Sequence, residues 1–362
     1  MSTVDTTANP PYTGEKLHAL TMQIRQWGRE LGFQQIGISD LQLEQDEQHL
    51  HEWLANDYHG EMDYMARHGS KRSHPDELIP GTLRVISARM DYWPGTALNA
   101  KQALQDSQSA YVSRYALGRD YHKVVRSRLA QLAERISAAV QPHHYRVFVD
   151  SGPVLEKALA RNAGLGWIGK HTNLINRQAG SWFFLGELLT NLPLPIDTPV
   201  ENHCGTCTAC MEVCPTQAIV APYTVDARRC VSYLTIELRS SIPVEYRKAI
   251  GNRIYGCDDC QLFCPWNKFA KASNEPDFTP RQRLDSSRLI DLFAWSEAEF
   301  LNYTTGSAIR RIGYECWLRN IAVALGNAKR SEAVINALHS RQHHESDLVR
   351  EHVSWALQQH SD

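Results

Sequence analysis

Long apolar runs, a strong excess of one charge and a leader-like start are all missing from this 362-residue sequence. No segment approaches the ~18 apolar residues that a membrane-spanning helix needs, and residues 1–11 have neither the basic nor the apolar region of a signal peptide. The 38 Lys+Arg residues nearly balance the 40 Asp+Glu residues, which leaves a formal net charge of −2. We therefore expect a cytoplasmic protein without membrane contacts, in which any affinity for nucleic acid comes from local basic patches.

The length predicts two or three domains, since one domain spans roughly 150 residues. Residues 1–15 are predicted to form a disordered tail. Helical periodicity at 16–31 and 122–140 alternates with β-like runs at 83–88 and 147–149, which predicts an α/β domain over residues 16–195. Residues 192–199 contain three prolines, break both periodicities and are typical of a linker.

Helical periodicity dominates residues 273–362, which we expect to form a C-terminal helical domain. The segments 321–325 and 353–357 match at an interval of 32 residues, the size of a helical-pair repeat. Two ordinary amphipathic helices would give the same match, so both interpretations stay open.

Eight of the nine cysteines lie in residues 196–272, and disulfides are rare in a reducing compartment, so their spacing points to ligands. The first run, Cys204-x2-Cys207-x2-Cys210-x3-Cys214-Pro215, follows the bacterial ferredoxin pattern. The second run, Cys257-x2-Cys260-x3-Cys264-Pro265, repeats the back half of that pattern, and Cys230 lies between the runs. This spacing predicts a ferredoxin-like module with two 4Fe-4S clusters.

In ferredoxins the cysteine before the proline binds the other cluster of the pair. We therefore predict crossed ligation, with one cluster held by Cys204, Cys207, Cys210 and Cys264 and the other by Cys214, Cys230, Cys257 and Cys260. Zinc is the alternative, but it favours two separated C-x2-C pairs. A radical-SAM site is excluded because neither run provides the C-x3-C-x2-C spacing.

Asp150 stands where a β-like run ends and Ser-Gly-Pro turns the chain toward a helix. The apolar neighbours Phe148, Val149 and Val154 predict desolvation, which would raise the pKa of the carboxyl and make it a general acid. A simple helix N-cap is the alternative, since Asp is a preferred residue there.

Gly164-x-Gly166-x-x-Gly169 follows a predicted helix, whereas a dinucleotide fingerprint follows a strand, so a nucleotide site is excluded. We expect these glycines, with Trp167, to let the backbone approach a large flat ligand. Lys170 and His171 come next and are either part of that pocket or merely solvated.

The segment 114–123 mixes aromatic and charged residues and would either line a ligand or form a solvated helix end. Its Asp120-Tyr-His122 resembles the start of a cobalamin D-x-H-x-x-G motif, but Val125 occupies the glycine position. His122 is therefore not predicted to be a cobalt ligand.

Two local basic stretches, 228–253 and 310–330, each carry an excess of four positive charges. Such clusters can bind phosphates of a nucleic acid, with nearby aromatics for unpaired bases. Solvated helix faces are the alternative. The basic residues are Arg228, Arg229, Arg239, Arg247, Lys248, Arg253, Arg310, Arg311, Arg319, Lys329 and Arg330.

Taken together, the Asp150-Ser-Gly-Pro-Val-Leu-Glu-Lys segment, the Gly-Leu-Gly-Trp-Ile-Gly-Lys170 segment, the eight cysteines and the repeat-like tail resemble the epoxyqueuosine reductase family. The resemblance covers nearly the whole chain. It implies an α/β cobalamin-binding domain, a ferredoxin-like two-cluster module and a HEAT-like helical domain that helps to bind a tRNA anticodon stem-loop.

The implied reaction is a two-electron removal of the epoxide oxygen from a modified wobble base, which releases water, with Asp150 as the proton donor. The implied partners are the tRNA and an external flavodoxin- or ferredoxin-type electron donor, and we expect a monomer. The family holds cobalamin without a histidine on cobalt. The corrinoid-pocket residues expected from the matching segments are Tyr115, His122, Lys123, Asp150, Ser151, Lys170, His171 and Asn173.

Two other functions are compatible with parts of the sequence. A reductive dehalogenase-like enzyme would also combine a corrinoid with iron–sulfur clusters, but it usually carries a twin-arginine signal. A ferredoxin-type electron carrier would use the clusters but would leave the first domain without a role.

Overall fold

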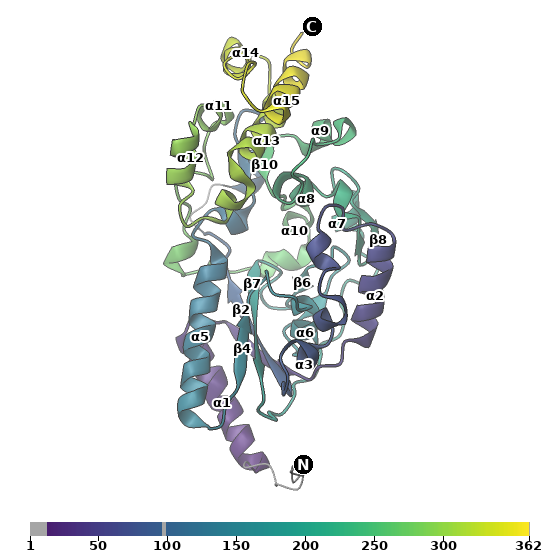
Figure 1. The fold of residues 1–362 in the computed structure, drawn as a ribbon, viewed down its shortest axis with the longest axis vertical. Coiled ribbons are helices and arrows are strands. Elements are labelled where there is room, and N and C mark those ends of the chain that lie inside the picture. The colour runs from purple at the N-terminus through teal and green to yellow at the C-terminus, as the bar shows by residue number, and fades with distance from the viewer. Residues whose placement is uncertain (1–12, 96–98, 362) are drawn as a thin grey trace, which may run out of the picture.

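The computed structural model describes residues 13–95 and 99–361 (Figure 1). Most of the predicted tail lies outside the described residues. Its last residues belong to helix α1 (Gly14–Glu30), which begins two residues before the predicted start. None of the helices in the described part of the chain combines the length and the apolar character needed to cross a membrane.

An antiparallel sheet of four strands, in the order β1-β2-β7-β4, forms the centre of the first domain. The strands are β1 (Gln35–Ser39), β2 (Arg84–Asp91), β4 (Tyr145–Phe148) and β7 (Phe183–Thr190). The predicted β-like runs at 83–88 and 147–149 correspond to β2 and β4. The two central strands, β2 and β7, pair over their full length.

Helices cover both faces of this sheet (Figure 1). Ile86 and Ala88 of β2 belong to the core beneath α1 and α5 (Tyr121–Ala139), whereas Val85 packs with Leu159 of α6 (Glu156–Asn162) on the other face. This alternation is the period of two that a strand imposes. The start of α5 and the loop after β4 lie at the same end of the sheet.

The remaining elements of the first domain are short. They are α2 (Glu44–Ala55), η1 (Asp63–Met65), η2 (Gly69–Arg72), α3 (Pro75–Leu78), α4 (Ala100–Gln105), β3 (Tyr111–Val112), η3 (Arg114–Ala116), β5 (Trp167–Ile168) and β6 (Leu174–Ile175). The predicted linker, 192–199, has no regular structure but is packed: Leu192 and Leu194 are buried, and Asp197 accepts hydrogen bonds from Arg25 and from the backbone of Ile38.

The cysteine-rich module contains short helices and strands. They are α7 (Ala209–Glu212), β8 (Ile219–Ala221), β9 (Thr224–Val225), η4 (Ala227–Arg229), α8 (Val231–Ile236), α9 (Val244–Ile250), β10 (Arg253–Tyr255), α10 (Asp259–Leu262) and η5 (Pro265–Phe269). Strand β10 pairs with β3 of the first domain. The buried carboxylate of Asp258 accepts hydrogen bonds from Tyr111, Ser113 and the backbone of Arg114, which joins the two regions further.

Helices make up the C-terminal part, as predicted. They are η6 (Pro276–Phe278), α11 (Leu289–Phe293), α12 (Glu297–Tyr303), η7 (Ala308–Ile312), α13 (Gly313–Asn327), α14 (Glu332–His339) and α15 (Asp347–Gln358). The matching segments 321–325 and 353–357 lie on α13 and α15, which pack against each other. A Cβ atom on Gly326 would lie 2.5 Å from the ring of Trp355, so glycine allows this close approach.

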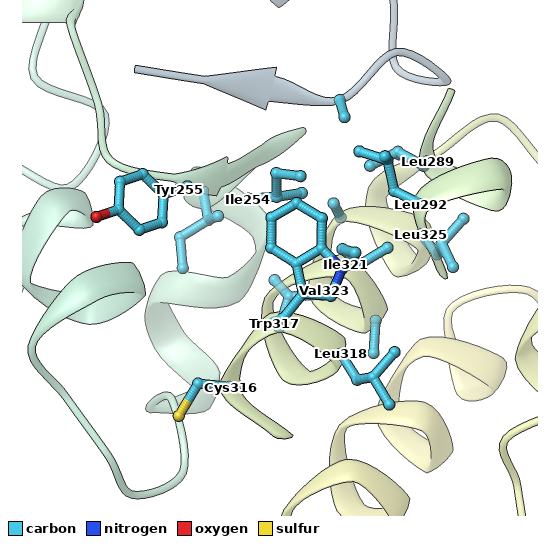
Figure 2. Packing of buried hydrophobic residues seen from close by; sticks show 14 of the residues in the cluster. Ile254, Tyr255, Leu289, Leu292, Cys316, Trp317, Leu318, Ile321, Val323 and Leu325 are labelled. Atoms are coloured by element: carbon cyan, nitrogen blue, oxygen red, sulfur yellow. The ribbon is translucent and has the colours of Figure 1, made fainter. Parts of the chain in front are cut away.

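The largest hydrophobic core crosses the predicted boundaries at residues 196 and 273. It joins Val112, Ile254 and Tyr255 to Trp317 and Ile321 of α13, and Figure 2 shows α13 side chains directed toward β10 and α11. Cys316 is 6% exposed in this core, where it packs as a small apolar residue. The domain boundaries stay predictions, but these parts share one core.

Candidate functional site

Sulfur atoms from both cysteine runs line one cavity. Cys204, Cys207 and Cys210 of the first run and Cys264 of the second border a space of about 270 Å³. Within residues 13–95 and 99–361, no three His, Cys, Asp or Glu side chains converge in the manner of ligands to a single metal ion. The four cysteines predicted for one cluster therefore lie around the same cavity. That they bind a cluster stays a prediction.

Three of the other four cysteines also lie close to one another. Burial raises the pKa of the Cys260 thiol well above its ordinary value, and the charges of Cys230, Asp258 and Cys214 add to this effect. Burial likewise raises the pKa of Cys230, with a further contribution from Cys214. Cys257 Sγ lies 2.9 Å from Asp259 Oδ2, to which it donates.

Lys170 and His171 both border the cysteine cavity. Lys170 Nζ donates to the carbonyl oxygens of Gly205 at 2.7 Å and Cys207 at 2.9 Å, so it holds the loop of the first cysteine run. His171 is 4% exposed, its Nδ1 accepts from the backbone N–H of Asn173, and burial lowers its pKa to about 4. The alternative that both side chains are merely solvated is wrong.

Aromatic rings surround this cavity, and the sequence analysis assigned a role only to Trp167. The Trp167 ring meets those of His203 and Trp266 edge to face, with centroids 5.1 Å and 5.0 Å apart. His203 and Trp266 also border the cavity. Their positions directly before Cys204 and after Cys264-Pro265 are the sequence signal that could have identified them.

The three glycines before Lys170 serve chain packing. A Cβ atom on Gly166 would lie 2.2 Å from the carbonyl oxygen of Ile175, and one on Gly164 would lie 2.7 Å from that of Thr198. Gly164 also has a positive φ of 72°. The interpretation that these two glycines open the backbone to a flat ligand is wrong, because the protein chain fills that space.

Asp150 lies on the loop between β4 and α6, and its partners come from α5. Its Oδ2 accepts from Tyr121 Oη at 2.6 Å and lies 2.8 Å from His122 Nε2. The helix N-cap interpretation is wrong, because α6 begins six residues later. Asp150 has a positive φ of 55°, an uncommon conformation for a residue other than glycine.

The predicted rise in the pKa of Asp150 is also wrong. Enclosure by the protein acts to raise this pKa, but the hydrogen bonds from His122 and Tyr121 and the charges of His122 and Arg311 outweigh it, so the pKa lies below 3.8. The side chain is 56% exposed.

His122 links Asp150 to Asp120. Asp120 caps the N-terminus of α5 and its Oδ1 lies 2.8 Å from His122 Nδ1. Burial acts to lower the pKa of His122, but the hydrogen bonds with Asp120 and Asp150 raise it above 6.5. Both ring nitrogens therefore have partners, in agreement with the expectation that His122 is not a cobalt ligand.

Arg311 completes this group from the C-terminal region. Its Nη2 donates to Asp120 Oδ2 at 3.0 Å, and its Nη1 lies 2.9 Å from His122 Nε2. In the sequence, Arg311 stands out only as a member of the basic stretch 310–330. No local pattern connects it with residues nearly 190 positions earlier.

Glu156 and Lys157 lie beside Asp150 and had no predicted role. Glu156 Oε1 accepts from the backbone N–H of Asp150 at 2.6 Å. Burial and the charge of Asp150 raise the pKa of Glu156 to about 8. Desolvation lowers the pKa of Lys157, although the charges of Asp150, Glu156 and Cys260 act to raise it. Lys157, which is exposed, thus lies near the Asp150 carboxylate and Cys260.

The other predicted pocket residues differ in position. Tyr115 is partly buried, and its ring centroid lies 5.8 Å from that of Tyr121. Ser151 directly follows Asp150 and is exposed, and Lys123 is exposed on α5. The structure therefore groups Tyr115, His122, Asp150 and Ser151 at one end of the sheet, and Lys170, His171 and Asn173 at the cysteine cavity.

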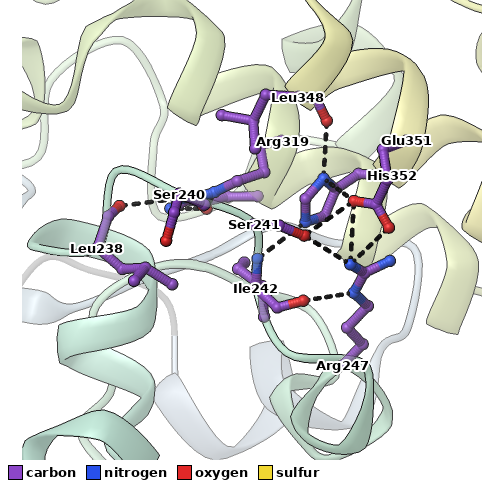
Figure 3. Close-up of polar contacts among 10 residues, drawn as sticks. Leu238, Ser240, Ser241, Ile242, Arg247, Arg319, Leu348, Glu351 and His352 are labelled. Carbon is purple, nitrogen blue, oxygen red and sulfur yellow. Dashed lines mark hydrogen bonds and ion pairs between the residues drawn. The ribbon is translucent and has the colours of Figure 1, made fainter. Parts of the chain in front are cut away.

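Much of the predicted phosphate-binding charge is internal. Arg319 is fully buried and donates to the carbonyl oxygens of Leu238 and Ser240, and Arg247 is paired with Glu351 (Figure 3). Arg253 is paired with Asp259 and nearly buried. The expectation that these three arginines bind nucleic-acid phosphates is wrong, because the fold uses their charges for its own polar groups.

Comparisons with known proteins match both the region that contains Asp150 and the cysteine-rich module. Residues 72–151 match the family model "Epoxyqueuosine reductase QueG, DUF1730", and residues 203–267 match the model "4Fe-4S double cluster binding domain". The chain therefore contains a domain of the double-cluster iron–sulfur type.

Solved structures support the same assignment. A selenomethionine-labelled epoxyqueuosine reductase superposes with a TM-score of 0.87 at 27% identity, covering 96% of this chain and 92% of that one. An epoxyqueuosine reductase with an epoxyqueuosine-modified tRNA-Tyr stem-loop has a TM-score of 0.86 at 28% identity, covering 96% and 91%.

Curated relatives match along almost the whole chain. Epoxyqueuosine reductase of Pseudomonas aeruginosa is 61% identical over 344 residues, which cover 95% of each chain. The Escherichia coli enzyme is 59% identical, covering 95% of this chain and 90% of its own. The chain belongs to the epoxyqueuosine reductase family.

Proposed function

We propose that this chain reduces epoxyqueuosine to queuosine at the wobble position of tRNA, with Asp150 as the proton donor. The observation that carries this proposal is the position of Asp150, which Tyr121 and His122 hold at one end of the sheet, with Lys157 near both Asp150 and Cys260. A proton source thus lies in the same region as a cysteine predicted to hold a cluster. The names of the relatives and the stem-loop bound to the related enzyme support tRNA as the substrate.

The two cysteine groups fit two 4Fe-4S clusters with crossed ligation. One would be held by Cys204, Cys207, Cys210 and Cys264 around their shared cavity, and the other by Cys214, Cys230, Cys257 and Cys260. The clusters would supply single electrons, received from an external flavodoxin- or ferredoxin-type donor. Lys170 holds the cluster loop, and His171, which borders the same cavity, accepts a hydrogen bond from the backbone of Asn173 in the turn before β6.

A corrinoid bound at this end of the sheet would have no histidine ligand from His122, because partners occupy both of its nitrogens. Cobalamin bound there would supply the reducing centre for the epoxide. Tyr115, His122, Asp150 and Ser151 are the pocket residues we retain, with Lys123 at the rim. This chain's own task is to orient the base and to place a proton beside the epoxide oxygen.

Asp150 is suited to that task by position. Protonating the epoxide oxygen makes it a better leaving group, and the hydrogen bonds with Tyr121 and His122 hold the Asp150 carboxyl group in one position for that transfer. The positive φ of Asp150 directs the side chain toward α5. A Bacillus subtilis relative, with a TM-score of 0.86 at 27% identity, has been solved with a catalytic aspartate loop swung out of its active site, which supports this assignment.

Asp150→Asn tests the proposal. We expect the variant to retain both clusters and the corrinoid absorption but to lose about 100-fold or more in single-turnover product formation, because Asn cannot donate the proton. The substrate is an epoxyqueuosine-containing anticodon stem-loop, and Asp291→Asn, at an exposed position, is the matched control. Unchanged product formation in Asp150→Asn would remove Asp150 from the mechanism.

The alternative functions give different results in the same preparation. A ferredoxin-type carrier would bind no corrinoid, and a dehalogenase-like enzyme would leave the stem-loop unchanged. Mass analysis of tRNA nucleosides from a strain without this protein then shows whether epoxyqueuosine accumulates in cells.

A further inference from the structure

Three charged groups surround the imidazole of His122. Asp120 lies at Nδ1, Asp150 lies at Nε2, and Arg311 of η7 reaches both Nε2 and Asp120. Tyr121 on the same helix donates to Asp150, and Glu156 of α6 holds the backbone of Asp150. His122 is only 9% exposed, so water has little access to its proton.

The proposed reaction needs two protons at a single oxygen atom. An epoxide, two electrons and two protons give an alkene and water, in which both C–O bonds are broken. One carboxyl group delivers one proton per ionisation, so Asp150 must be reprotonated between the two bond cleavages. In this structure its Oδ2 is bonded to His122 rather than directed only to solvent.

We propose that His122 is the positioning residue that refills Asp150, as the middle member of an Asp120–His122–Asp150 proton relay. This inference rests on the proposed function and extends it. The proton moves from His122 Nε2 to Asp150 Oδ2 along their 2.8 Å contact and then from Asp150 to the substrate oxygen. His122 keeps its Nδ1–H toward Asp120 and regains the Nε2 proton from solvent after turnover.

The position of Arg311 agrees with this transfer. A guanidinium N–H can only donate, and Nε2 offers a lone pair only after its own proton has passed to Asp150. The 2.9 Å contact between Arg311 Nη1 and Nε2 can therefore become a hydrogen bond only after that transfer, and the charge of Arg311, which lowers the pKa of Asp150, then favours release of the proton to the substrate. Because η7 belongs to the C-terminal region, this contact also connects that region to the acid.

His122→Asn tests the relay in the full chain with both clusters reconstituted. We expect a loss in single-turnover product formation of about 100-fold at alkaline pH and a smaller loss at acidic pH, where solvent can protonate Asp150 directly. The alkaline decline should therefore begin at a lower pH than in the unmodified protein. Added imidazole should restore part of the lost rate. His143→Asn is the control, since that histidine is bonded to Ser137 and Thr190 instead.

A second variant and a spectroscopic readout separate the relay from a structural role. Asp120→Asn keeps the shape but removes the negative charge at Nδ1, so its alkaline decline should also begin at a lower pH. Infrared difference spectra against Asp150→Asn report the protonation of the Asp150 carboxyl without turnover, and His122→Asn should shift its titration.

Other results have distinct meanings. A uniform loss in His122→Asn, with an unchanged pH profile and no effect of imidazole, would refute the relay. If Asp150→Asn retains full turnover, the proposed proton donor fails. If Asp150→Asn is inactive while His122→Asn is unimpaired, only the relay fails.

Discussion

Asp150 and Glu156 are neighbouring carboxyl groups with opposite pKa shifts. Asp150 has hydrogen-bond donors from α5, which lower its pKa, whereas burial and the charge of Asp150 raise the pKa of Glu156 to about 8. Glu187 of β7 lies beyond them, fully buried, and burial raises its pKa well above the ordinary value. Asp150 thus releases its proton more readily than an ordinary carboxyl group, whereas Glu156 and Glu187 hold theirs more tightly.

Glu156→Gln should change the pH dependence of stability. A carboxyl group whose pKa is raised from 4.5 to about 8 binds its proton more tightly in the folded state, so its contribution to stability falls as the pH rises through that window. Gln keeps the acceptor for the Asp150 N–H but cannot ionise. We expect the stability of the variant, relative to that of the unmodified protein, to increase by about 1 to 2 kcal/mol as the pH rises from about 5 to 8.

The measurement is the free energy of unfolding by denaturant at both pH values under anaerobic conditions. Glu245→Gln, at an exposed position on α9, is the control. Glu156→Gln and the unmodified protein should differ in free energy of unfolding by different amounts at the two pH values. An equal difference at both would contradict the assignment of this titration to Glu156.

At the level of elements, buried arginines join α13 and α15 to the cysteine-rich module. Arg319 of α13 donates to the backbone carbonyls of Leu234, Leu238 and Ser240 around the end of α8, where a helix has unpaired carbonyl groups. Arg247 of α9 makes the corresponding contact with Glu351 of α15 (Figure 3). A count of charges along the sequence cannot distinguish such arginines from phosphate ligands.

Arg319→Met should therefore destabilise the fold strongly. Met fills part of the volume but leaves three buried carbonyl groups without their donor, at a cost of about 3 kcal/mol. Denaturant unfolding measures the loss, and Arg126→Met, at an exposed position of α5, should stay within about 0.5 kcal/mol. A loss as small as that of the control would show that the Arg319 bonds do not stabilise the fold.

For the molecule as a whole, the cysteine groups depend on how two distant runs fold together. Cys264 lies with the first run, while Cys260, only four residues earlier, lies near Cys214 and Cys230. Cys260 belongs to helix α10, whereas Cys264 follows that helix, directly before η5. Under the crossed ligation that we predict, each cluster takes cysteines from both runs.

Double variants test this arrangement. Cys210→Ala combined with Cys264→Ala should lose only one cluster, the same loss as either single variant, because both remove ligands of one cluster. Cys260→Ala combined with Cys264→Ala should lose both clusters. Iron and sulfide content and the electron paramagnetic resonance of the reduced protein distinguish these outcomes. Loss of a single cluster in the second pair would overturn the crossed ligation.

The sequence by itself determined the features that depend on local spacing: the cysteine runs, the helices and strands around Asp150, and the family resemblance. Tertiary structure alone decided which distant groups meet. His122 and Arg311 come near Asp150 from distant parts of the chain. The hydrogen bonds from His122 and Tyr121, together with the charges of His122 and Arg311, outweigh the desolvation that the apolar neighbours of Asp150 predict. A pKa depends on the groups in space around a carboxyl, and sequence neighbours supply only some of them.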